Sequence, residues 1–71
     1  SPAQNEIHIS TDFGQTASAA TQIFDRSGRL LYGAERIFGK GLSETSIPIQ
    51  LPSGVYVLRI GKASKKFVVV Q

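Results

Sequence analysis

The sequence predicts an all-β fold: a small antiparallel sandwich of six to seven strands in a single domain over residues 1–71. Seven glycines and three prolines interrupt the 71 residues every few positions, which leaves no room for a helix of ordinary length. Between these breaks apolar and polar residues alternate, as they do in strands with one buried face. Short turn sequences join most of these stretches, and this favours a sandwich over a parallel sheet.

The first expected strand lies near Ile7 and Ile9, which alternate with polar residues. Apart from these two, residues 1–18 offer only Phe13 as a core candidate, so we interpret them as a linker plus a first strand. The sequence does not begin with methionine, and we expect it to be a piece from the C-terminal end of a longer exported protein.

A β-hairpin is predicted around residues 25–28, between the apolar stretches 21–24 and 29–32. Asp25 at the first turn position can accept a hydrogen bond from the backbone N–H two residues on, and Gly28 can take a positive φ at the end. We therefore assign Asp25 and Gly28 a structural role in the turn.

A further strand is expected across Ile47, Ile49 and Leu51, which alternate with less apolar residues. Pro48 lies within this stretch and cannot donate a ladder hydrogen bond, so the strand is predicted to be an edge strand. Residues 51–54 then form the next turn, with proline at its second position.

The two strongest strand signals close the chain. Residues 54–60 are apolar on both faces, which predicts a central strand, and residues 65–71 repeat this pattern after two lysines. Residues 61–64 connect the two strands.

The residue composition argues against an enzyme. His8 is the one histidine, there is no cysteine, and the five carboxylates form no close pair in sequence. We expect no catalytic group, no cofactor site and no metal site, and we interpret His8 as an exposed strand residue. The net charge of +3 is small and scattered, and Lys65 and Lys66 point to opposite faces of a strand, so we expect no nucleic-acid binding.

Several stretches resemble a known family. Residues 23–31 contain a D-x-x-G-R turn, residues 51–60 read L-P-S-G-V-Y-V-L-R-I, and residues 65–71 supply a K-K-aliphatic terminus. Together they are similar to the type A C-terminal sorting domain of the type IX (Por) secretion system. The resemblance covers about residues 19–71, and the second stretch is its most specific part.

The resemblance implies an immunoglobulin-like sandwich that acts as a non-catalytic address for a cargo protein. The cargo domain would precede this chain. The domain would pass through the periplasm, dock on the outer-membrane translocon, and on many cargoes be removed by a sortase-type peptidase that joins the cargo to lipopolysaccharide. The destination would be the outer membrane, the cell surface or the medium.

The resemblance also implies where the translocon would recognise the domain. If the final strand has a free edge, it could pair with a receptor sheet or with another copy of the chain. The alternative is an immunoglobulin-like accessory or adhesion module that binds carbohydrate or protein and stays on its parent. The residues expected to carry recognition are Gly54, Val55, Tyr56, Val57, Leu58, Arg59, Ile60, Lys65, Lys66, Phe67, Val68, Val69, Val70 and Gln71.

Overall fold

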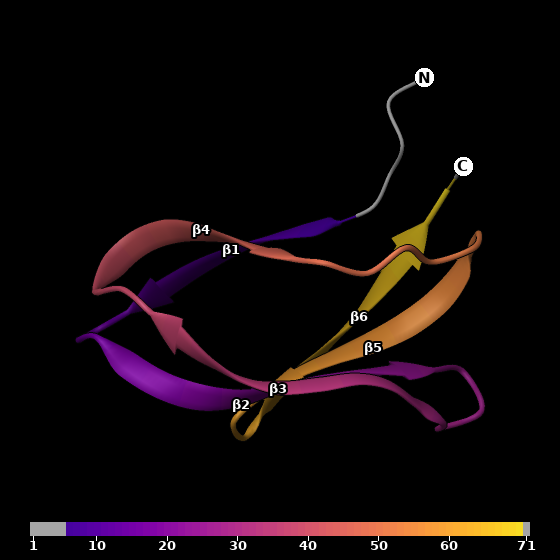
Figure 1. Cartoon of the computed structure of the whole chain (residues 1–71), viewed down its shortest axis with the longest axis horizontal. Coiled ribbons are helices and arrows are strands. Elements are labelled where there is room, and N and C mark those ends of the chain that lie inside the picture. Colours follow the sequence, from indigo (N-terminus) through magenta and orange to yellow (C-terminus); the bar gives the residue numbers. More distant parts are fainter. Residues whose placement is uncertain (1–5, 71) are drawn as a thin grey trace. The chain divides into compact units, whose positions relative to one another are not determined.

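The computed structural model describes residues 6–70, which contain strands and no helix (Figure 1). The all-β prediction is confirmed, and the strand count agrees with the six to seven expected. The strands are β1 (Ile7–Phe13), β2 (Ala17–Asp25), β3 (Leu30–Phe38), β4 (Gly41–Ile47), β5 (Gly54–Ile60) and β6 (Ala63–Val69).

The chain divides into two compact units. The first unit comprises Ser1–Ala17 and Ile37–Gln50, and the second comprises Ser18–Arg36 and Leu51–Gln71. Each unit contains one antiparallel sheet. The single domain expected over residues 1–71 stays a prediction.

The sheet of the first unit has two strands, β1 and β4. They pair antiparallel, from Ile7 opposite Ile47 to Phe13 opposite Gly41. At the far end the rings of Phe13 and Phe38 stack, with centroids 5.0 Å apart and planes within 7°. Ile47 and Phe38 are fully buried. Aromatic stacking and aliphatic burial therefore stabilise this unit.

The sheet of the second unit has four strands in the order β3-β2-β5-β6. Strand β5 pairs antiparallel with β2 on one side and with β6 on the other, so the prediction of a central strand is confirmed. Strand β6 lies at the edge of the sheet (Figure 1). Ile23 and Thr21 on β2 are fully buried, and Tyr56 and Leu51 are nearly so.

The strand predicted across Ile47, Ile49 and Leu51 is wrong beyond Ile47. Strand β4 ends at Ile47, and residues 48–53 lie outside the strands. The N–H of Ile49 donates instead to the carbonyl of Ile47 at 2.9 Å, which closes a tight turn around Pro48. Pro48 itself has no N–H to extend the ladder. The strand starts earlier, at Gly41, in a polar stretch whose Leu42 is 83% exposed.

Candidate functional site

The turn between β2 and β3 is organised by one carboxylate oxygen. Oδ1 of Asp25 accepts hydrogen bonds from the Ser27 N–H at 2.9 Å, the Ser27 hydroxyl at 2.6 Å and the Arg29 N–H at 2.9 Å. The Gly28 N–H donates to the Asp25 carbonyl at 2.9 Å, and Gly28 has a φ of 92°. Both Asp25 and Gly28 thus form part of the turn between β2 and β3.

These hydrogen bonds favour the ionised form of the Asp25 carboxyl. The Ser27 hydroxyl bond, followed by the Arg29 N–H bond, lowers the pKa of Asp25 below its ordinary value of 3.8. The carboxylate accepts three hydrogen bonds within the turn, and this structural role explains why an aspartate stands at this position.

The hairpin of β5 and β6 brings the predicted recognition residues together. Its two-residue turn begins with Gly61, whose φ is 59°, and Ile60 pairs with Ala63 across it. A glycine at the first central position suits a tight hairpin turn because a side chain there would strain the backbone. The predicted segments 54–60 and 65–71 therefore lie side by side from Gly54 opposite Val69 onward; Gln71 lies outside the described residues. Strand β6 starts at Ala63, two residues earlier than predicted, because the glycine turn lets Ala63 pair with Ile60.

Part of the family-like stretch has a folding role. The Tyr56 hydroxyl donates to the carbonyl of Pro52 at 2.6 Å, and its ring lies 5.7 Å from that of Phe67 on the neighbouring strand. A Cβ built on Gly54 would have the Tyr56 hydroxyl 3.4 Å away. Tyr56 is only 7% exposed, and Leu51 is buried as well. These residues position the hairpin, and their buried side chains are not accessible to a partner.

The accessible part of the hairpin is basic. Arg59, Lys65 and Lys66 are exposed, as is Lys62 in the turn, and strands β5 and β6 carry no carboxylate. The Nε of Arg59 donates to the Gly61 carbonyl at 3.2 Å, which holds the guanidinium near the turn. The hairpin thus presents four positive charges without an acidic residue of its own.

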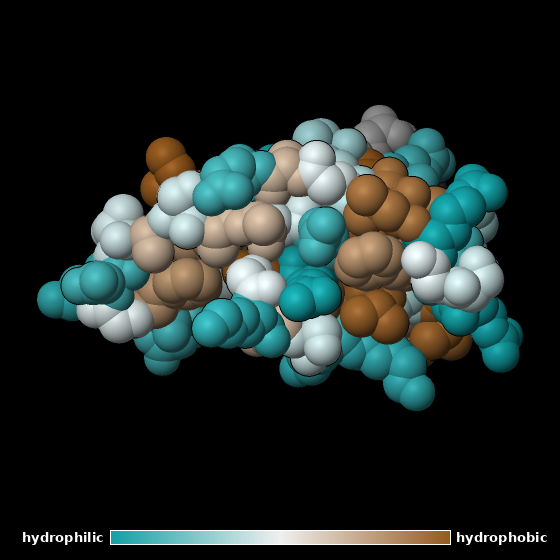
Figure 2. Space-filling view, turned by 90° about the horizontal axis from the view of Figure 1, so that it is seen from below, coloured by the Kyte–Doolittle hydropathy of each residue, from teal (hydrophilic) through white to brown (hydrophobic). Residues whose placement is uncertain are grey.

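Exposed apolar side chains accompany these charges. In the second unit Leu30, Val68 and Val70 are exposed, and Val68 shows 65% of its surface. Val68 pairs with Val55, and the next pair on the same face of the hairpin is Val57 with Lys66. Figure 2 shows hydrophobic side chains gathered in a group, with hydrophilic ones around them, on the face that it views.

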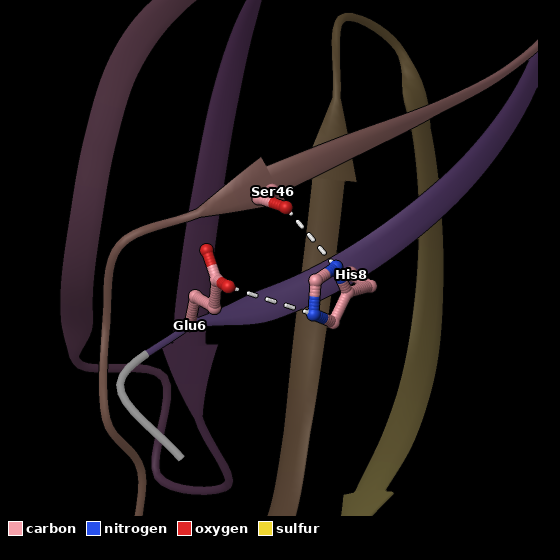
Figure 3. A network of polar contacts seen from close by, with 3 residues as sticks. All are labelled: Glu6, His8 and Ser46. Atoms are coloured by element: carbon pink, nitrogen blue, oxygen red, sulfur yellow. Dashed lines mark hydrogen bonds and ion pairs between the residues drawn. The ribbon is translucent and has the colours of Figure 1, made fainter. Parts of the chain in front are cut away.

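A second polar cluster lies on the sheet of the first unit (Figure 3). The Ser46 hydroxyl is 3.0 Å from Nδ1 of His8, and a Glu6 carboxylate oxygen is 3.8 Å from Nε2. Serine, imidazole and carboxylate stand in the order of a hydrolase triad. However, the His8 and Glu6 side chains are 54% and 53% exposed, so water reaches both groups, whereas a reacting group in an enzyme is usually shielded from it. We interpret the cluster as surface polar contacts.

The sequence reasoning missed two features of this geometry. Ser46 was not expected to lie beside His8, because 38 residues separate them and the pairing of β1 with β4 alone brings them together. The bond from Tyr56 to Pro52 was also missed, although its spacing of four residues is local. Within residues 6–70 no group of three potential metal ligands occurs, and no helix is long and apolar enough to cross a membrane.

Comparison with known proteins adds one finding. The whole chain, residues 1–71, matches the family model described as the secretion system C-terminal sorting domain. No curated protein and no solved structure matches the chain.

Proposed function

Since the chain belongs to the family of secretion system C-terminal sorting domains and so acts as a sorting signal for type IX secretion, we propose that the hairpin of β5 and β6 is the part that the secretion machinery reads. The observation that carries the proposal is the position of β6. It is an edge strand on which the Lys65 and Lys66 side chains are exposed to solvent.

The rest of the sorting domain supports this hairpin. The pairing of β2 with β5 fixes one side of it, and the Tyr56 hydroxyl ties it to the preceding segment. Recognition then needs no reactive group, in keeping with the non-enzymatic role that the family implies. An edge with unpaired backbone groups and charged side chains can supply both affinity and selectivity to a binding partner. The family match favours this function over an accessory or adhesion module.

The family implies interaction with the type IX machinery and export across the outer membrane. We propose that the outer-membrane translocon binds the hairpin, and we expect the cargo domain to precede the chain. The domain passes through the periplasm with its cargo. As on many cargoes with such a domain, a sortase-type peptidase would then remove it, and the cargo would be joined to lipopolysaccharide at the cell surface or released.

The proposal is tested with a periplasmic reporter fused to residues 1–71 in a bacterium that has this secretion system. The intact fusion is expected to reach the cell surface or the medium. Replacing both Lys65 and Lys66 with glutamate is expected to retain the reporter in the periplasm. The matched control replaces Arg26 and Lys40, two exposed basic residues outside the hairpin, with glutamate. Equal export of both double variants would contradict the role of the hairpin.

A further inference from the structure

The outer edge of β6 exposes a defined set of backbone groups. The N–H of Gly61 donates to the carbonyl of Ala20 on β2 at 2.9 Å, so the odd-numbered residues of β5 direct their backbone groups to β2. The even-numbered ones then face β6, where Ile60 pairs with Ala63 and Leu58 with Lys65. By the alternation of an antiparallel ladder, the N–H and C=O groups of Ser64, Lys66 and Val68 point away from β5.

No described strand satisfies these groups, because β6 is the last strand of its sheet. Each is a donor or acceptor that an added strand could pair with. A lipid or sugar surface would not offer the matching row of donors and acceptors. The geometry of the edge therefore points to an extended protein segment.

The side chains of β6 restrict which segment fits. Lys65 and Lys66 are adjacent and point to opposite faces, so both faces of an added strand would meet a positive charge at this level. Phe67 and Val68 follow immediately and offer apolar surface on the same two faces. A segment with carboxylates opposite the lysines and apolar side chains opposite the next two residues would complement the edge.

The same charges act against pairing with a second copy of the chain. A symmetric antiparallel pairing centred on Lys66 would place Lys66 opposite Lys66, and like charges directly opposite each other destabilise a strand pair. The lysines thus oppose self-association in this register while favouring an acidic strand.

Resting on the function proposed above, we propose that β6 accepts an added antiparallel strand from its receptor along Ser64, Lys66 and Val68, and that this strand carries two adjacent carboxylates followed, toward its N-terminus, by two apolar residues. The receptor strand extends the four-stranded sheet by a fifth strand. Backbone pairing supplies the affinity, and the two carboxylates supply the selectivity.

A peptide titration tests the inference on the 71-residue chain. The probe is an acetylated heptapeptide of threonine, valine, phenylalanine, two glutamates and two threonines, and the control peptide has lysines in place of the glutamates. Amide NMR signals of Ser64, Lys66 and Val68 are expected to shift, and their hydrogen exchange to slow, with the acidic peptide only. Equal response to both peptides, no response at all, or shifts elsewhere would overturn the inference, as would a concentration-dependent dimer of the chain through these amides.

Two variants separate backbone from side-chain contributions. Val68→Pro removes an outward N–H without removing a ladder bond to β5, whereas Val68→Ala keeps the N–H and removes only the side chain. We expect Val68→Pro to abolish peptide binding and Val68→Ala to retain most of it. Reversing one charge with Lys66→Glu should weaken binding about twofold to thirtyfold, because one cross-strand pair changes from attraction to repulsion. The variant Lys40→Glu, with the same change in net charge, should bind as the parent does.

The same variants in the reporter fusion separate this inference from the sorting function. Failure of the intact fusion to be exported would contradict the function itself. Export of the Val68→Pro fusion at the level of Val68→Ala would overturn the strand-pairing inference and leave the sorting function in place.

Discussion

Removing the Tyr56 hydroxyl tests whether this side chain stabilises the fold of the hairpin. Tyr56→Phe removes the bond to the Pro52 carbonyl at 2.6 Å and leaves the ring against Phe67. A hydrogen bond of this kind contributes about 0.5–1.5 kcal/mol net. Pro52 is exposed, so water can reach its carbonyl in the variant, and we expect the loss to stay near the middle of that range. A loss of about 1 kcal/mol lowers Tm by about 4–8 °C in a domain of this size.

The assay is urea and thermal unfolding of the 71-residue chain, followed by circular dichroism. Tyr32→Phe is the matched control, because the Tyr32 hydroxyl contacts Arg36 at 3.0 Å within the same strand and ties no separate segment to the sheet. The control should lose less than about 0.5 kcal/mol. Unchanged stability of Tyr56→Phe, or equal losses in both variants, would refute the reasoning. Below its unfolding range Tyr56→Phe should still bind the acidic peptide as the parent does, whereas Lys66→Glu should keep its stability and bind the peptide about twofold to thirtyfold more weakly.

Three further predictions concern the folded framework. Ile23→Ala, at a fully buried position of β2, should cost about 2–5 kcal/mol of unfolding free energy, measured by urea titration; a loss below 1 kcal/mol, on the order of a surface substitution, would contradict the packing described. The Ser27 hydroxyl bond lowers the pKa of Asp25 below 3.8, so its contribution to stability is complete at higher pH and is lost as pH falls through the folded-state pKa. Asp25→Asn should therefore show a weaker decline of the urea midpoint between neutral and acid pH, and a parallel decline would count against this role. Gly61→Ala, at a φ of 59°, should cost about 1 kcal/mol or more through backbone strain, again read from the urea midpoint, and an unchanged midpoint would speak against that strain.

The features predicted correctly from the sequence are local ones. The turn at Asp25 and Gly28 depends on four consecutive residues, and the turn beginning at Gly61 joins two strongly apolar strands. Such turns follow from side-chain hydrogen bonding and from the freedom of glycine at positive φ, which need no distant partner. The all-β class follows for the same reason, since the alternation of apolar residues is visible within each strand.

Apart from the local bond from Tyr56 to Pro52, the features that were missed depend on distant partners. Strand β4 has weak apolar alternation, and its pairing with β1 joins residues such as Ile7 and Ile47 that lie far apart in sequence. The strand predicted beyond Ile47 had the better alternation and still did not form, because Pro48 could not continue the ladder and the chain turned there. Strand propensity is overridden when pairing and burial favour another segment.

The sequence by itself determined the all-β class, the turn at residues 25–28, and a hairpin of two apolar strands with its lysines, whose connection it placed at residues 61–64. The structure shortens that connection to residues 61–62, because Ala63 already pairs with Ile60. Only the tertiary structure decided that β2 is the second neighbour of the central strand β5 and that Tyr56 is buried, and it left Lys66 and Val68 on the open edge. Turns and the alternation of apolar residues are encoded by neighbouring residues. Strand order depends instead on contacts between segments that are distant in the sequence, and no local pattern specifies which of them meet.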